Sequence, residues 1–93
     1  MTNLTRAMAL DYAKENIRVN AICPAVIHTP MLQREIDVQD DKEAFLKELD
    51  ELHPIGRIGQ PEEVAFAVLM VAADEASFIT GANIAVDGGF TAV

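Results

Sequence analysis

Cysteine, basic residues and long hydrophobic runs are scarce in this chain of 93 residues, and each scarcity excludes a class of protein. The single cysteine, Cys23, excludes an intramolecular disulfide and argues against a zinc site built from cysteines. Seven Lys and Arg face fifteen Asp and Glu, and the net charge of −8 disfavours binding to nucleic acid or to anionic membranes. The longest apolar run, residues 64–73, is about half of the ~20 residues that cross a bilayer.

What is present indicates one small folded domain. Hydrophobic residues make up 51% of the chain and charged residues 24%, which is typical of a globular protein. We see no signal peptide, because no basic region followed by an apolar stretch opens the chain, and we expect a cytoplasmic protein. Between residues 31 and 53, eight acidic residues face three basic ones. We interpret this segment as the solvated face of a helix, with a lid over a ligand as the alternative.

Helical periodicity predicts helices over residues 4–14, 40–52 and 61–73. The start of the last helix is marked by Pro61 and by two glutamates in its first turn. Its apolar residues cover nearly the whole circumference, so we expect it to be buried on more than one side.

Alternating side chains predict strands over residues 17–23 and 83–87. A strand that returns to a strand through a helix implies a parallel pair with a right-handed crossover. Two strands are few for a sheet, so the pattern indicates part of a larger one. The predicted fold class is α/β, a partial Rossmann-like, doubly wound fold with two parallel strands and three or four helices.

Four stretches, in this order and at this spacing, resemble the C-terminal part of the short-chain dehydrogenase/reductase (SDR) family. They are residues 4–10 (LTRAMAL), 17–24 (IRVNAICP), 54–65 (PIGRIGQPEEVA) and 80–81 with 86–89 (TG and VDGG). The resemblance implies a Rossmann domain that binds NAD or NADP and moves a hydride to or from a carbonyl or alcohol carbon. It also implies that residues 1–93 form one segment, with 30–53 as the substrate-loop region and 61–93 as the last helix and strand.

The catalytic residues that the resemblance implies are missing, so we assign none. The family uses a Tyr, a Lys four residues later and a Ser, but Tyr12 is followed by Asn16, and Ser77 matches no such position. By register, the family's Tyr/Lys pair would lie just before Met1. The Gly-rich turn that carries the cofactor pyrophosphate is also absent.

One cofactor-contacting segment is implied by the resemblance. Residues 24–31 resemble the family's loop against the nicotinamide ring, and residues 24–29 of this stretch are here called the cofactor-wall loop. Pro24 and Ile27 would pack on the ring, and the Ile27 backbone and the Thr29 hydroxyl would bond its carboxamide. A strand-ending turn is the alternative interpretation. Ala25 stands where the family usually has glycine, and a positive φ there would be strained.

The remaining candidates receive structural interpretations. His28 and His53 have no ligand-like spacing, so we expect surface or turn positions, with a substrate contact as the alternative. Cys23 is interpreted as a small core residue, and the methionines as core fillers. Arg57 is expected to pair with a carboxylate or cap a carbonyl, and Asp87 to form a turn.

Two classes of function follow from the resemblance. The chain is either the C-terminal part of an NAD(P)-dependent oxidoreductase, inactive alone and binding the cofactor weakly or not at all, or a non-catalytic assembly module. As an assembly module it would form a homo-oligomer through residues 61–93 or join a full-length SDR relative. A half-enzyme that complements an N-terminal fragment is a further alternative.

Overall fold

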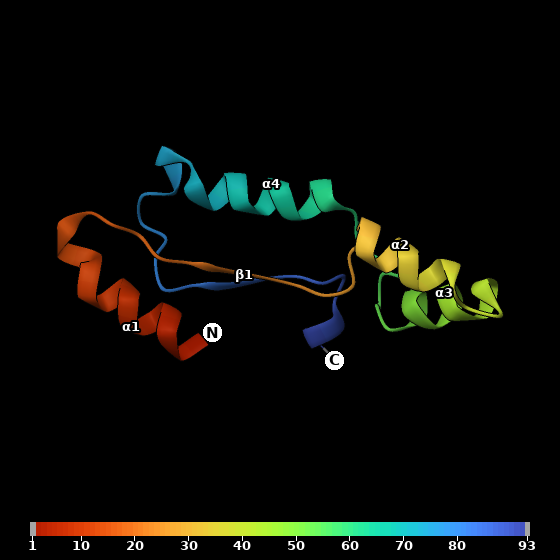
Figure 1. Ribbon diagram of the computed structural model, residues 1–93. Coiled ribbons are helices and arrows are strands. Elements are labelled where there is room, and N and C mark those ends of the chain that lie inside the picture. Colours follow the sequence, from red (N-terminus) through yellow and green to blue (C-terminus); the bar gives the residue numbers. More distant parts are fainter. Residues whose placement is uncertain (1, 93) are drawn as a thin grey trace.

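The centre of the molecule is a pair of parallel strands with helices on both sides, as Figure 1 shows. The computed structural model describes residues 2–92. Its elements in chain order are α1 (Thr2–Tyr12), η1 (Ala13–Glu15), β1 (Ala21–Pro24), α2 (Pro30–Asp37), α3 (Lys42–Glu51), α4 (Pro61–Ala72), η2 (Asp74–Ala76), β2 (Asn83–Val86) and η3 (Phe90–Ala92).

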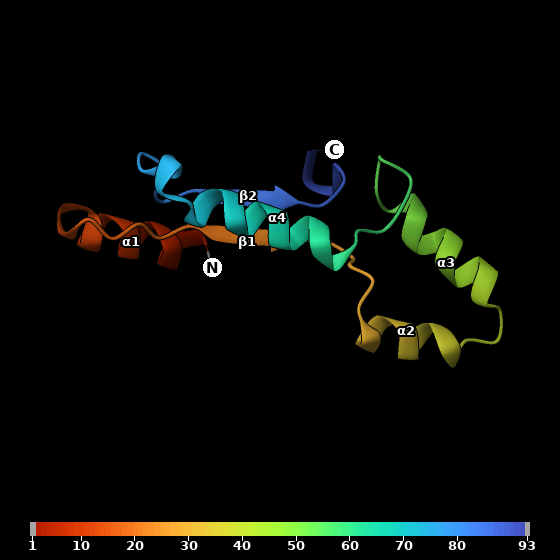
Figure 2. The same ribbon diagram turned by 90° about the horizontal axis from the view of Figure 1, so that it is seen from above.

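The strands pair in parallel, with Ala21 opposite Asn83 and Pro24 opposite Val86, which confirms the predicted topology. Helix α4 connects them and packs on one face of both strands. Helix α1 lies on the other side, toward the end where the strands begin, and α2 and α3 lie beyond the end where the strands stop (Figure 2). The arrangement is part of a doubly wound α/β fold.

The first strand is shorter than predicted, because its expected first half is held mainly by side chains, with one backbone bond from the Gly81 N–H to the Val19 carbonyl over 2.7 Å. The Val19 N–H donates to Thr80 Oγ1 over 3.0 Å. The Asn20 amide donates to the Ile79 carbonyl over 3.1 Å and accepts from the Ala82 N–H over 3.0 Å. Residues 17–20 therefore lie beside residues 79–82, which precede β2, without forming a strand.

Helix α2 was not predicted, although its start carries two signals. Thr29 caps it, with its Oγ1 accepting from the Leu32 N–H over 3.3 Å, and Pro30 takes the first position. A helix of eight residues offers too little periodicity to be predicted from the sequence. Helix α3 follows, capped by Asp41, whose carboxylate accepts from the Ala44 N–H.

Several burial expectations are wrong. Helix α4 contains no buried residue, and Phe66 and Leu69 are 62% and 68% exposed, because two strands cover only one side of it. Cys23 is exposed rather than part of the core. The methionines placed by the structure are not core fillers either, since Met8, Met31 and Met70 are all exposed.

The buried core is small for a chain of this mass. Its hydrophobic members are Ala9, Ala21, Ile36 and Ile58, and none of the large side chains that the structure describes is fully buried. The accessible surface is 6880 Å², against about 5,300 Å² expected for a folded monomer of 10.1 kDa. The radius of gyration is 16.3 Å, where about 12 Å is expected for this length. Much apolar surface is therefore left uncovered.

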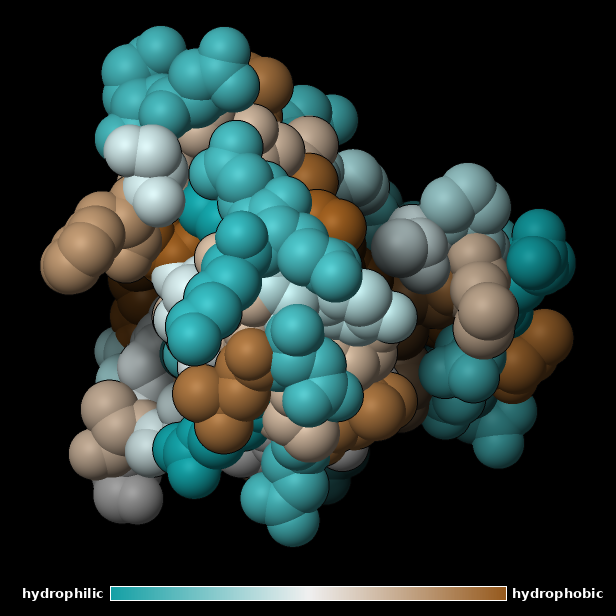
Figure 3. Space-filling view, turned by 90° about the vertical axis from the view of Figure 1, so that its left-hand side faces the viewer, coloured by the Kyte–Doolittle hydropathy of each residue, from teal (hydrophilic) through white to brown (hydrophobic). Residues whose placement is uncertain are grey.

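Figure 3 views the end of the molecule that lies at the left in Figure 1 and shows apolar side chains at the surface among hydrophilic ones. Exposed apolar residues near this end include Leu10, which is 79% exposed, and Phe78, which is fully exposed. None of the helices in residues 2–92 is long and apolar enough to cross a membrane.

Candidate functional site

The cofactor-wall loop leaves the carboxyl end of β1, at the edge where both parallel strands stop. In open α/β sheets, ligands bind outside the carboxyl ends of the strands. A cavity of about 280 Å³ lies at this edge. Its lining includes Val26, Ile27, His53, Arg57, Glu63 and residues 85–89.

A short parallel bridge to Gly59 fixes the middle of the loop. The Gly59 N–H donates to the Val26 carbonyl, and the His28 N–H donates to the Gly59 carbonyl, both over 2.9 Å. Because these bonds use the residues on either side of Ile27, the N–H and carbonyl of Ile27 itself point to the opposite side of the segment. A Cβ at Gly59 would lie 2.7 Å from Ile27 Cδ1, so a glycine gives the Ile27 side chain its room.

The three predicted contact residues lie on this one loop. Ile27 and Thr29 are half-buried and Pro24 is exposed. Thr29 Oγ1 accepts from the helix backbone, which leaves its own proton free for donation. Ala25 does not have a positive φ, so the expected strain is absent there. An apolar side chain, an outward-facing peptide and a hydroxyl donor fit a flat ring that carries a carboxamide.

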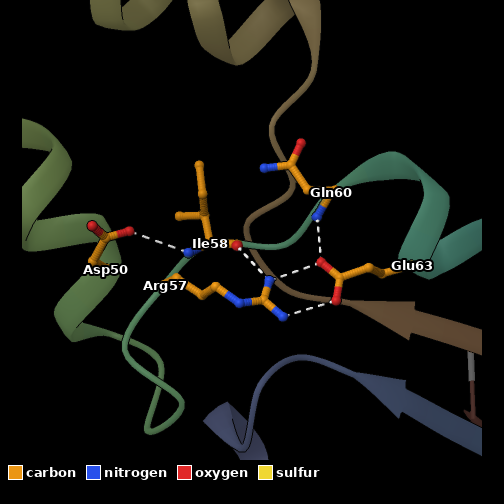
Figure 4. A network of polar contacts seen from close by, with 5 residues as sticks. All are labelled: Asp50, Arg57, Ile58, Gln60 and Glu63. Atoms are coloured by element: carbon orange, nitrogen blue, oxygen red, sulfur yellow. Dashed lines mark hydrogen bonds and ion pairs between the residues drawn. The ribbon is translucent and has the colours of Figure 1, made fainter.

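An ion pair holds the turn beside the loop, as Figure 4 shows. The Arg57 guanidinium donates to both carboxylate oxygens of Glu63, over 2.8 and 2.9 Å, which confirms the expected carboxylate partner. Glu63 Oε1 also accepts from the Gln60 N–H over 2.9 Å, which caps α4. The hydrogen bonds from Arg57 and from the Gln60 backbone lower the pKa of Glu63 to about 2. The Glu63 carboxylate, in turn, raises the pKa of Arg57.

The other end of this turn is joined to α3. Asp50 Oδ1 accepts from the Ile58 N–H over 3.2 Å (Figure 4). The turn over residues 57–60 is therefore held from α3 on one side and from α4 on the other. Its position fixes Gly59, and through Gly59 the cofactor-wall loop.

Asp87 forms the turn after β2, as predicted. Its carboxylate accepts from the Gly89 N–H over 3.0 Å and from the hydroxyl of Thr91 over 2.6 Å. The hydrogen bond from Thr91 is the main reason that the pKa of Asp87 lies below its ordinary value. Gly88 and Gly89 follow with φ of +58° and +93°, a backbone conformation that L side chains rarely adopt.

Of the two positions expected for His53, the surface is wrong, because its side chain is only 3% exposed. The turn is confirmed, because the Gly56 N–H donates to the His53 carbonyl over 2.7 Å. The ring lies between the end of α3 and the cofactor-wall loop, with its Nδ1 2.9 Å from the Leu49 carbonyl. It also packs at a tilt against Phe90, with 6.1 Å between ring centroids. Nothing in the sequence around His53 indicates burial, because its partners come from separate segments. His28, by contrast, is half-buried and pairs with Gln33 through Nε2.

No catalytic constellation is found in residues 2–92. Tyr12 ends α1, and Asn16 follows it in a left-handed conformation, with φ of +62°. Ser77 follows η2, near the end at which the strands begin and away from the cofactor-wall loop. The described residues also contain no group of three or more His, Cys, Asp or Glu that could hold a metal ion.

Comparison with known proteins identifies the family. Residues 1–91 match the family described as "Enoyl-(Acyl carrier protein) reductase". The chain is 47% identical over 93 residues to 2,5-dichloro-2,5-cyclohexadiene-1,4-diol dehydrogenase of Sphingobium indicum. It is 46% identical over 91 residues to cyclohexanol dehydrogenase of an Acinetobacter species. These matches cover 100% and 98% of this chain, but 36% and 33% of the relatives.

Solved structures agree. A C-terminal deletion mutant of Thermoplasma acidophilum aldohexose dehydrogenase matches with a TM-score of 0.88 at 44% identity, over 99% of this chain and 42% of the other. ElxO with NADP bound matches with a TM-score of 0.89 at 32% identity, over 99% and 36%. The chain belongs to the short-chain dehydrogenase/reductase family and spans about a third of the length of the curated relatives it matches.

Proposed function

We propose that residues 1–93 are the C-terminal part of an NAD(P)-dependent oxidoreductase that acts on an alcohol or carbonyl substrate, and that this part supplies one wall of the nicotinamide site. The observation that carries the proposal is the cofactor-wall loop, anchored at the carboxyl edge of the strands with the Ile27 peptide facing away from its anchor. The names of the relatives, a cyclic diol dehydrogenase and cyclohexanol dehydrogenase, support an alcohol as the substrate class.

In this proposal the chain binds and orients the nicotinamide. When bound, the reduced cofactor would donate a hydride to a carbonyl carbon, and the oxidised cofactor would accept one from an alcohol carbon. Pro24 and Ile27 present apolar surface to the ring and keep water from one side of it. The Ile27 peptide and the Thr29 hydroxyl provide hydrogen bonds that fix which way the carboxamide points, and with it which face of the ring meets the substrate.

We further propose that the isolated chain has no dehydrogenase turnover. It has no Tyr-x-x-x-Lys pair to transfer the proton and no Gly-rich turn to bind the pyrophosphate. An assay of the purified protein with NADH or NADPH and a panel of cyclic and acyclic carbonyls tests this. Background consumption of the cofactor is the expected result, and turnover proportional to protein concentration would contradict it.

A second candidate function, an assembly module, is favoured by the uncovered surface. The stripe on α4 formed by Phe66, Leu69 and Met70 is 56–68% exposed. Burial of this apolar surface would stabilise the protein by about 25 cal/mol per Å². We propose that a second copy of residues 61–93, or a full-length SDR relative, covers this stripe. A fragment that completes the cofactor site and restores turnover would make the chain a complementing half-enzyme instead. We place this function in the cytoplasm, in keeping with the composition.

A further inference from the structure

The nearly buried ring of His53 joins three segments that are far apart in the sequence. The Leu49 carbonyl at the end of α3 lies 2.9 Å from Nδ1. The Val26 N–H, in the cofactor-wall loop, points at Nε2 over 3.4 Å. Phe90, after β2, packs against the ring. A titratable side chain that is 3% exposed, with both nitrogens engaged, is placed to orient its neighbours.

The two contacts fix the tautomer of the ring. A carbonyl can only accept, so Nδ1 carries the proton in the contact with Leu49. In the neutral ring Nε2 is then unprotonated and can accept from the Val26 N–H. No other acceptor for this N–H is found in residues 2–92.

Val26 makes two of the hydrogen bonds that hold the cofactor-wall loop. Its carbonyl accepts from Gly59, on the side of the turn over residues 57–60, and its N–H donates to His53, on the side of α3. The Val26 N–H lies in the peptide plane between residues 25 and 26, and the Val26 carbonyl shares the next plane with the Ile27 N–H, so both planes are held directly before Ile27. Rotation of the backbone at Val26 would turn the outward-facing peptide of Ile27.

We propose that His53 is a positioning residue that, together with the Gly59 bridge, sets the orientation of the Ile27 peptide, and so of the nicotinamide carboxamide, a role that rests on the proposed function of the cofactor-wall loop. It does so by accepting from the Val26 N–H through Nε2 while α3 fixes its ring through Nδ1. The end of the acidic segment 31–53 is thereby coupled to the cofactor wall. The side chain of His53 contacts neither cofactor nor substrate in this role.

The test uses the 93-residue protein labelled with ¹⁵N. The wild type is expected to show the Nδ1–H tautomer of His53 and slow hydrogen exchange at the Val26 amide. His53→Phe keeps a ring beside Phe90 and removes the acceptor, so exchange at Val26 should accelerate at least about tenfold, as loss of ~1.4 kcal/mol of protection would give. His53→Gln restores an acceptor and should recover most of the protection. Gln33→Leu, the control, removes the partner of the other histidine from outside the loop and should leave Val26 unchanged.

Three results overturn the proposal: the Nε2–H tautomer in the wild type, unchanged Val26 exchange in His53→Phe, or no recovery in His53→Gln. If His53→Phe does not fold, the wild-type tautomer and the His53→Gln exchange decide. Titration with nicotinamide mononucleotide separates this proposal from the function of the loop. Shifts at Ile27 and Thr29 that are the same in wild type and His53→Phe contradict the role of His53 only. Absence of shifts in the wild type, with Val26 protected, contradicts the cofactor wall only.

Discussion

The carboxyl edge of the strands and the outer face of α4 differ in how well their side chains are partnered within the chain. At the carboxyl edge of the strands, Arg57, Glu63, Asp50 and His53 pair with backbone or with each other, and the described residues contain no buried side-chain polar atom without a partner. On the outer face of α4, the apolar side chains have no cover. The polar contacts around the cofactor-wall loop are made within this chain, whereas the apolar face of α4 is left uncovered by it. The chain therefore combines a loop region held by hydrogen bonds with a small core.

The largest expected effect is on the uncovered side. Leu69→Asp places a charge in the middle of the α4 stripe, where an unpaired charge in an apolar contact costs about 3 kcal/mol or more. We expect self-association to weaken on the order of 100-fold, since every ~1.4 kcal/mol is tenfold in the dissociation constant. Sedimentation equilibrium measures this.

The control for that experiment is Val38→Asp, at the end of α2, an equally exposed apolar position away from the stripe. It should leave association unchanged. A wild-type protein that is folded and monomeric at tens of micromolar would contradict self-association through residues 61–93 and would leave a full-length SDR relative as the partner of the stripe.

A smaller effect is expected where α4 meets the start of β1. Arg18 donates to the carbonyls of Val71, Ala73 and Ile79 over 2.7–3.2 Å and so holds the C-terminal end of α4. Arg18→Leu should lower the free energy of unfolding by about 2 kcal/mol, because charge-assisted hydrogen bonds are lost while the carbonyls stay partly covered. Urea unfolding measures it. Lys14→Leu removes an exposed charge of the same sign and should change stability by less than ~0.5 kcal/mol.

Beside the cofactor-wall loop, Gly59→Ala tests the close approach of the Ile27 side chain to Gly59. The new Cβ would lie 2.7 Å from Ile27 Cδ1, so the side chain must rotate, at a cost of about 1 kcal/mol. Thermal unfolding measures this change. Ile27→Val removes the colliding methyl group, so the double variant should regain most of the loss. Additive losses in the double variant would show that Ile27 Cδ1 does not limit the space at Gly59.

The smallest effect is a dependence on pH from Glu63. Its pKa is lowered from 4.5 to about 2 in the folded protein, so the stabilisation is complete above pH 4.5 and is lost as the pH falls toward 2. Glu63→Gln should therefore flatten the fall in unfolding free energy between pH 4.5 and 2 relative to the wild type. The pair is half exposed, so the difference is small and screened by salt. Equal slopes in acid denaturation would contradict the ion pair.

The same division separates what the sequence could predict from what it could not. The parallel pair, the start of α4 at Pro61, the Arg57 partner and the Asp87 turn follow from local spacing and turn chemistry, and the structure confirms them. Burial could not be predicted, because the apolar circumference of α4 does not indicate how little of the rest of the chain packs against it. Cys23 and His53 were misplaced for the same reason: exposure depends on segments distant in sequence.

As proposed above, this chain carries a wall for the nicotinamide and lacks the sites for the rest of the cofactor. An NMR titration of the wild-type chain with nicotinamide mononucleotide, and separately with adenosine monophosphate, tests it most directly. The account predicts that only the nicotinamide nucleotide shifts the amides of residues 24–29, with a dissociation constant no tighter than about 1 mM, or about −4 kcal/mol. Equal shifts from adenosine monophosphate, or saturation near micromolar concentrations, would contradict it.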